Sequence, residues 1–232
     1  LILNSPCNPS GAAVPAEELG RFAALSRQHG FLLIADETYE FFFYGDGKFA
    51  SVAALSREIR DRLVLIGSFS KSYAMTGWRV GYALGPKPLI SAVARIQSHD
   101  ASHTASFAMR GAVAALQCPR SVLDSMTKEY RRRRDLMVEG LSKVEGMRCQ
   151  VPAGAFYVFP NVRGMMERFG CSSSEQLARK LLLGPGIATV AGSAFGTDGY
   201  LRFSYATSAE RIREGIRRLQ ECREHPEPGG EA

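Results

Sequence analysis

The sequence "RLVLIGSFSKSYAMTGWRVGYALG", residues 62–85, decides how the sheet of this protein is built. Its first part is apolar from Leu63 to Ile66, which is typical of a strand buried in a core. A second strand is predicted over 78–85, and it begins about seven residues after Ser70. A crossover between parallel strands needs about a dozen residues or more. We therefore expect the second strand to run antiparallel to the first.

Upstream of this stretch, the sequence predicts a strand, a helix and a second strand. "LILN", residues 1–4, and "FLLIAD", residues 31–36, are the two strands. Between them, Pro15 is suited to a helix start and Gly30 to a helix end. A strand–helix–strand unit of this length is typical of a parallel pair. The apolar run in 31–36 indicates a sheet covered on both faces. The predicted fold class is α/β, with a mostly parallel sheet, one antiparallel strand and helices on both faces.

Downstream of Pro88, the pattern predicts a smaller α+β C-terminal domain. The predicted helices lie near 89–99, 105–117, 120–145, 161–169, 174–183 and 208–223. The predicted strands are "CQVP" (149–152), "GAFYVFP" (154–160), "IATVAG" (187–192) and "YLRFSYA" (200–206). We predict one domain over 1–122, a small domain with a connecting helix over 123–224, and a disordered tail over 225–232, which is rich in Pro, Gly and Glu.

Composition excludes several classes of protein. The chain has 232 residues, 45% of them hydrophobic and 22% charged, which is an ordinary globular balance. No apolar stretch approaches the roughly 18 residues of a membrane span, so no membrane partner is expected. Five cysteines without CxxC spacing and four scattered histidines predict neither a disulfide framework nor a metal site, and a cytoplasmic location fits them.

The net charge of +6 is concentrated locally in "YRRRRD", residues 130–135. Such a run can mark a nucleic-acid patch. Four consecutive arginines on a helix point in four directions, however, and they make a poor binding stripe. We interpret the run as a solvated helix and expect no nucleic-acid partner.

Polar side chains follow each predicted parallel strand, where ligands of open α/β sheets bind. They are Asn8 after the first strand, Asp36 and Tyr39 after the second, and Ser68, Ser70, Lys71 and then Arg79 after the third. Pyridoxal 5′-phosphate needs an amine for its aldehyde, a carboxylate for its ring nitrogen, and hydroxyls and a guanidinium for its phosphate. The residue types together therefore predict a pyridoxal-phosphate site.

Five motifs, in this order, resemble those of the class I/II aminotransferases, which are fold-type I, aspartate-aminotransferase-like pyridoxal-phosphate enzymes. They are "NPSG", "ADETY", "SFSKSYAMTGWRVGY", "GAFYVFP" and "YLRFSYA". The resemblance covers nearly the whole chain, up to about residue 220. It implies an enzyme of amino acid metabolism that transfers an amino group between an α-amino acid and a 2-oxo acid, and that works as a homodimer.

The resemblance implies a role for each candidate residue. Lys71 binds the cofactor aldehyde covalently and moves a proton at the substrate Cα. Asp36 pairs with the ring nitrogen, and Arg202 binds the substrate α-carboxylate. The other cofactor-binding roles fall to Asn8 and Tyr39 at the phenolic oxygen, and to Ser68, Ser70 and Arg79 at the phosphate. The resemblance also implies a cis peptide bond between Asn8 and Pro9.

The same family places a glycine-rich phosphate loop and a ring-stacking aromatic residue ahead of the segment that matches 1–4. We therefore expect this sequence to be the C-terminal part of such an enzyme, and by itself an incomplete, inactive one. Two alternative functions stay open: a β-lyase on the same fold, and a ligand-sensing aminotransferase-like domain of a transcription regulator. A truncated, inactive paralogue is a further alternative, and the structural alternatives are Lys71 as a surface lysine, Asp36 as a helix cap and Arg202 on an edge strand. We interpret Trp78 and Phe156 as packing residues, with Phe156 near the substrate.

Overall fold

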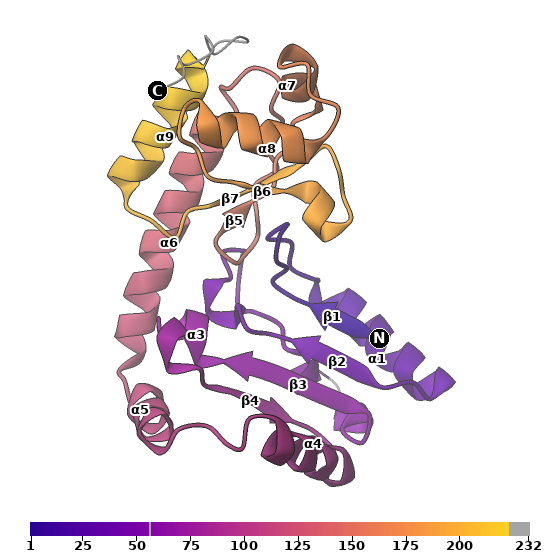
Figure 1. The fold of residues 1–232 in the computed structure, drawn as a ribbon. Coiled ribbons are helices and arrows are strands. Elements are labelled where there is room, and N and C mark those ends of the chain that lie inside the picture. The colour runs from indigo at the N-terminus through magenta and orange to yellow at the C-terminus, as the bar shows by residue number, and fades with distance from the viewer. Residues whose placement is uncertain (56, 223–232) are drawn as a thin grey trace. The chain divides into compact units, whose positions relative to one another are not determined.

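A computed structural model describes residues 1–55 and 57–222 (Figure 1). These residues divide into two compact units. The first comprises Leu1–Cys7, Ala12–Thr127 and Ala153–Ala155, and the second comprises Asn8–Gly11, Lys128–Pro152 and the chain from Phe156 onward. The division falls inside a single long helix. The tail predicted over 225–232 lies outside the described residues.

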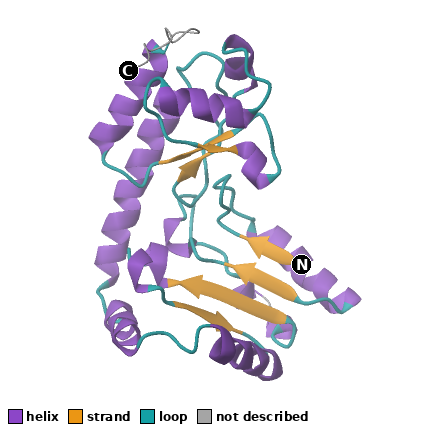
Figure 2. Cartoon of the chain, viewed as in Figure 1, coloured by secondary structure: helices purple, strands orange, loops and turns teal. Residues whose placement is uncertain are grey.

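The first unit is built on a four-stranded sheet in the order β1-β2-β3-β4 (Figure 2). The strands are β1 (Ile2–Asn4), β2 (Leu33–Asp36), β3 (Leu63–Ser68) and β4 (Gly81–Leu84). The first three run parallel, and β4 runs antiparallel to β3. The short connection before β4 therefore predicted its direction correctly. β4 begins later than expected, because Thr76–Trp78 form a 3-10 turn, η3, and Arg79 has a left-handed φ of 56°.

Helix α1 (Ala16–His29) makes the crossover between β1 and β2. Two glutamates in its first turn favour its N-terminus, and Gly30, with φ 71°, ends it by donating its N–H to the carbonyl of Ser26. Helix α1 and α2 (Val52–Leu55) pack together on one face of the sheet. The core cluster there consists of Leu19, Ala23, Leu33, Ala35, Val52, Ile59 and Leu63.

The first unit also contains short helical segments and the helices that lead to the second unit. Its elements are η1 (Glu40–Phe42), η2 (Arg57–Ile59), α3 (Phe69–Ser72), α4 (Lys87–Asp100), α5 (Ser106–Leu116) and the start of α6 (Arg120–Leu141). A second core cluster joins α5 to the segment after β3, through Phe69, Met75, Val80, Ala108 and Ala112. A Cβ on Gly111 would lie 2.5 Å from the Trp78 ring, so α5 approaches that ring closely.

The second unit contains a three-stranded antiparallel sheet in the order β5-β7-β6, with helices around it (Figure 2). Its elements are β5 (Tyr157–Val158), α7 (Arg163–Arg168), α8 (Ser174–Leu183), β6 (Val190–Ala191), η4 (Gly192–Phe195), β7 (Leu201–Ser204) and α9 (Ala209–Glu221), together with the rest of α6. The prediction of a strand over 149–152 is wrong. Arg148 makes an isolated bridge with Asn161, and the next four residues join no ladder. Pro152 has no N–H to donate, and its carbonyl accepts a hydrogen bond from Arg134 instead.

The four arginines at 131–134 lie on α6, as the helical interpretation requires. Arg132 and Arg133 both donate to Glu129, which lies one turn earlier on the helix. The side chain of Arg134 is nearly buried and pairs with Asp135. Arg132 and Arg133 thus have an acidic partner on the same helix, whereas the buried Arg134 departs from the expected solvated surface. None of the helices within the described ranges combines the length and the apolar character that a membrane span requires.

Candidate functional site

The carboxylate of Asp36 is held at the carboxyl end of β2 by two donors. The side-chain amide of Asn4 donates to Oδ2 at 2.8 Å, and the backbone N–H of Thr38 donates to Oδ1 at 3.1 Å. Asn4 and Asp36 are register partners on adjacent parallel strands, so their side chains lie on the same face of the sheet. The Thr38 contact is the cap-like one anticipated for Asp36. It coexists with the contact across the sheet, so capping alone does not account for this residue.

Lys71 lies just beyond the end of the neighbouring strand β3. Ser68 ends that strand and caps α3, because its Oγ accepts the backbone N–H of Ser70 at 3.1 Å. Lys71 follows within α3, where it is half-buried, and its carbonyl accepts the N–H of Ala74 at 3.1 Å. The serines therefore help to form the turn that carries the lysine out of the strand.

The loop between α3 and β4 holds two non-glycine residues in the left-handed region. They are Ala74, with φ 53°, and Arg79, with φ 56°. Such residues cost free energy in an L-amino-acid chain and concentrate at functional sites. The guanidinium of Arg79 is exposed, and its Nη1 donates to the Thr76 carbonyl at 2.7 Å. Tyr39, which follows β2, is only 5% exposed.

In the second unit, Arg202 on β7 is held by an amide and two aromatic rings. Its Nη1 donates to Oδ1 of Asn8 at 2.7 Å. Its guanidinium lies 4.4 Å from the centroid of the Tyr157 ring and 5.1 Å from that of Phe195. Cation–π contacts of this kind orient an arginine without using up its hydrogen-bond donors. β7 is the central strand of its sheet, so the alternative of an edge-strand surface residue is wrong for Arg202.

The peptide bond between Asn8 and Pro9 is cis, as predicted. The bond between Ser5 and Pro6 is also cis, which no feature of the sequence had led us to expect.

The predicted residues fall into two groups. Asp36, Tyr39, Ser68, Ser70, Lys71 and Arg79 belong to the first unit, and Asn8 and Arg202 belong to the second. Within the first unit, the register brings Asp36 opposite Ile66, two residues before Ser68 on the adjacent strand. The ends of β2 and β3 thus carry the carboxylate and the lysine segment at the same edge of the sheet.

Three contact residues were missed. Asn4 could have been found, since it is the last polar residue of the first predicted strand and the strand-end rule applies to it. Tyr157 and Phe195 gave no comparable signal, because Tyr157 is one of three aromatic residues in "GAFYVFP" and Phe195 is a single aromatic residue in a segment of small and polar residues. Phe156 is buried against the rings of Tyr130 and Tyr157, so it is a packing residue in the second unit.

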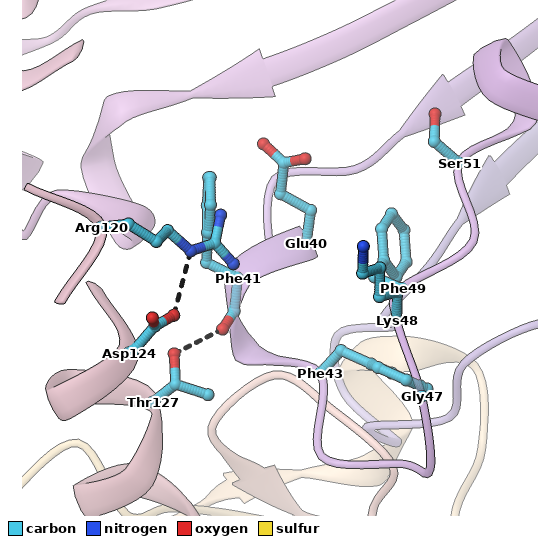
Figure 3. Close-up of a pocket in the computed structure, with 10 residues that line it drawn as sticks. All are labelled: Glu40, Phe41, Phe43, Gly47, Lys48, Phe49, Ser51, Arg120, Asp124 and Thr127. Carbon is cyan, nitrogen blue, oxygen red and sulfur yellow. Dashed lines mark hydrogen bonds and ion pairs between the residues drawn. The ribbon is translucent and has the colours of Figure 1, made fainter. Parts of the chain in front are cut away.

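A pocket of about 730 Å³ opens in the first unit beside η1 and the start of α6 (Figure 3). Its lining comprises Glu40, Phe41, Phe43, Gly47, Lys48, Phe49, Ser51, Arg120, Asp124 and Thr127. The α6 side is organised by two hydrogen bonds: Arg120 donates to Asp124 at 3.0 Å, and the Thr127 hydroxyl donates to the Phe41 carbonyl at 2.7 Å (Figure 3). Burial raises the pKa of Glu40, and the nearby Arg120 charge opposes that rise. None of the residues predicted to bind a cofactor lines this pocket.

Comparison with known proteins identifies one family along almost the whole chain. A family model described as "Aminotransferase class I and II" matches residues 1–219. Among curated relatives, a probable aspartate/prephenate aminotransferase of Aquifex aeolicus is 43% identical over 97% of this chain and 57% of its own length. An aspartate aminotransferase of Geobacillus stearothermophilus is 38% identical over 94% of this chain and 56% of its own length.

Solved structures agree with this result. An aromatic aminotransferase from Pyrococcus horikoshii has a TM-score of 0.87 and 36% identity, covering 95% of this chain and 58% of its own. The aspartate aminotransferase from Rhizobium meliloti has a TM-score of 0.86 and 37% identity, covering 95% and 56%. The chain thus spans a little more than half the length of the proteins it matches.

Glu37, next to Asp36 in the chain, is a buried carboxyl group with a structural task. It is 5% exposed, and its Oε1 accepts the backbone N–H of Val52 at the start of α2 at 3.1 Å. Burial raises the pKa of Glu37, and the hydrogen bonds from Ser51 and Val52 only partly offset that effect. The neutral form is therefore favoured in the folded chain more than in the unfolded chain.

The raised pKa of Glu37 in the folded chain predicts that the free energy of unfolding depends on pH. A raised folded-state pKa contributes stability that is complete below the unfolded pKa of about 4.3 and is lost as pH rises through the folded-state value. Glu37→Gln keeps the acceptor for Val52 and removes the titration. We expect the free energy of unfolding of the variant, relative to the parent protein, to improve as pH rises from about 4 to 7. Thermal or denaturant unfolding across that range measures it. A difference that stays flat with pH would contradict the burial argument.

Proposed function

Because the chain belongs to the class I and class II aminotransferase family, we propose that it forms the core of a pyridoxal-phosphate-dependent enzyme. That enzyme transfers an amino group between an α-amino acid and a 2-oxo acid. One observation carries the proposal: the Asp36 carboxylate and the Lys71 segment come from the carboxyl ends of adjacent parallel strands. An amine and a carboxylate at one edge of a sheet match the two polar ends of the pyridine ring that need protein groups.

The residues of the first unit fit this cofactor in chemical type. Asp36 is already oriented by two donors, and each of its oxygens keeps lone-pair capacity for a ring N–H. Ser68, Ser70 and Arg79 offer hydroxyls and a guanidinium, which are the groups that bind a phosphate. The Tyr39 phenol is proposed to donate to the ring's phenolic oxygen.

When bound, the cofactor supplies an electron sink for the bond that breaks at the substrate Cα. Lys71 is proposed to act twice. Its Nζ would hold the cofactor covalently in place of the aldehyde oxygen, which leaves as water, and, once released by the substrate amine, the same Nζ would move the proton at the substrate Cα. Asp36 would hold the proton on the ring nitrogen.

Arg202 is proposed to bind the substrate α-carboxylate. Its fork of donors suits a carboxylate better than an ammonium group does. The hydrogen bond to Asn8 and the two ring contacts support this role, because they hold the guanidinium while other N–H groups stay available. Asn8 is proposed to use its amide N–H on the phenolic oxygen of the cofactor while its Oδ1 accepts from Arg202.

The comparisons favour transamination over the two alternatives. The relatives carry the printed names aspartate, aspartate/prephenate and aromatic aminotransferase, and none of those cited is a lyase or a regulator. The α-carboxylate that Arg202 would bind is common to these substrates, so the proposal extends to an α-amino acid and a 2-oxo acid as a class.

The first test concerns Lys71. The full-length protein, incubated with pyridoxal phosphate and reduced with borohydride, should carry the phosphopyridoxyl mass on the peptide that contains Lys71. Lys71→Ala should lack this label, and its rate of amino transfer should fall about a hundredfold to ten-thousandfold. Lys48→Ala, in the same unit but outside the predicted site, is the matched control and should keep both. A label that persists in Lys71→Ala would refute the assignment.

The second test concerns Arg202. Arg202→Lys keeps the charge and loses the bidentate geometry, so kcat/KM for an amino acid should fall about ten- to hundredfold. The rate with the corresponding decarboxylated amine should change little, because that substrate has no carboxylate. Arg163→Lys, whose arginine donates to the Asp198 carbonyl in the same unit, is the control. An equal loss for the amino acid and the amine would assign Arg202 to structure.

A homodimer is proposed as the working assembly. Helices α4 and α5 present an exposed apolar surface, which consists of Val93, Ile96, Phe107, Met109, Val113 and Leu116. These six exposed apolar side chains lie on two consecutive helices, and exposed apolar side chains that gather on one part of a surface are typical of association sites.

Phe107→Glu in the full-length protein should therefore weaken the dimer, because it places a charge in the proposed contact. Phe107 is 72% exposed in the described chain, and Leu183 on α8 is equally exposed at 73%. Leu183→Glu is thus a matched control and should leave assembly unchanged. Sedimentation at micromolar concentration should give a dimer for the parent and the control, and a shift towards monomer for Phe107→Glu. A parent protein that is a fully active monomer would exclude the proposed assembly.

A further inference from the structure

We propose that Asn4 is a positioning residue, which holds the Asp36 carboxylate in the orientation that receives the ring nitrogen of the cofactor. The inference rests on the proposed function, because it takes Asp36 as the partner of that nitrogen. The inference assigns a role in cofactor binding to Asn4, which lies outside the "NPSG" motif and on a different strand from Asp36.

The geometry that carries the inference lies across β1 and β2. Asn4 ends β1 and Asp36 ends β2, and the two residues are direct register partners. The Nδ2 of Asn4 donates to Oδ2 of Asp36 at 2.8 Å. The same register pairing continues beyond the side chains, since the backbone N–H of Ser5 donates to the Asp36 carbonyl at 3.1 Å. The pairing of β1 with β2 therefore places the Asn4 amide beside Asp36, and it does so from a rigid element.

The other neighbours of Asp36 cannot replace this contact. Thr38 donates to Oδ1, but it does so from the loop two residues on, so that bond ties the carboxylate to the loop and not to the sheet. On the β3 side, the register partner of Asp36 is Ile66, whose aliphatic side chain donates no hydrogen bond. The torsion that turns a carboxylate about its Cβ–Cγ bond has broad minima, so a single donor leaves its plane poorly determined. The bond from Asn4 fixes that plane.

The chemistry of the residue agrees with this role. A carboxylate with two oxygens has about four acceptor positions, so the bonds from Asn4 and Thr38 leave positions for a ring N–H. The bond from Asn4 is charge-assisted and directional. An asparagine is also a poor strand residue, and a partly buried amide costs free energy unless it is bonded. An aliphatic side chain would serve strand packing at this position at least as well.

The experiment uses the full-length protein loaded with pyridoxal phosphate that is labelled with nitrogen-15 in the ring. It measures the chemical shift of the ring nitrogen and the dissociation constant of the cofactor. Asn4→Leu removes the donor at similar size, and the nearly isosteric Asn4→Asp replaces it with a second acceptor. Asp36→Asn is the benchmark for loss of the carboxylate, and Ile2→Ala, on the same strand and face, controls for disturbance of β1.

We expect Asp36→Asn to move the ring nitrogen to the shift of an unprotonated pyridine. Asn4→Leu should move it part of the way and weaken cofactor binding about tenfold, the scale of one hydrogen bond to a charged group. Asn4→Asp should also weaken cofactor binding, because the two carboxylates repel each other and turn Asp36 out of the orientation that the bond from Asn4 fixes. Ile2→Ala should leave both readouts unchanged.

Two different failures can be told apart. If Asp36→Asn shifts the ring nitrogen and both Asn4 variants match the parent in shift and affinity, the positioning role is wrong and the proposed function stands. A loss of thermal stability in those variants with an unchanged shift also excludes the positioning role, since a merely structural residue behaves that way. If Asp36→Asn leaves the ring nitrogen unchanged, the cofactor role of Asp36 fails, and this inference fails with it.

Discussion

The parallel pairing of β1, β2 and β3 is the constraint on which the described structure of the first unit depends. Parallel strands end at a common edge, and here that edge receives the amide of Asn4, the carboxylate of Asp36 and the segment that leads to Lys71. The crossover through α1 makes the first pairing possible, and the core under α1 and α2 holds the strands in register. A slip of one residue in β1 would turn Asn4 to the opposite face and remove its bond to Asp36.

Backbone and side chains contribute differently to the candidate site. Asp36 is oriented by the sheet, whereas Lys71 and Arg79 depend on a short helix and a loop with two left-handed residues. In the second unit, Arg202 depends on aromatic contacts and one amide. The carboxylate proposed to hold the cofactor ring thus lies on regular structure, and the group proposed to read the substrate is held by side-chain packing. Substitutions that repack Tyr157 or Phe195 would act on substrate recognition more than on cofactor binding.

Much of this fold was predictable from the sequence, and the reasons are local. The direction of β4 followed from the length of the connection before it, and the crossover α1 followed from its start and stop residues. No strand forms at 149–152, because pairing stops at the single bridge between Arg148 and Asn161 and Pro152 has no N–H for a ladder. Asn4 could have been identified as a strand-end residue, but its partner Asp36 depends on the register of β1 and β2. The contacts of Tyr157 and Phe195 with Arg202 depend on the packing of segments far apart in the chain. The polar residues that follow each predicted strand identified the residue types of the candidate site. The individual hydrogen bonds between those residues could be found only in the structure.

The outer strand β4 has a consequence for handling this polypeptide. It pairs with β3 on one side, and in the described part of the chain its other side presents unpaired backbone N–H and C=O groups, beside the exposed side chains of Tyr82 and Leu84. An uncovered, apolar strand border of this kind is a template for adding a strand from another molecule. A preparation containing just these residues would therefore gain intermolecular sheet along β4 at high concentration.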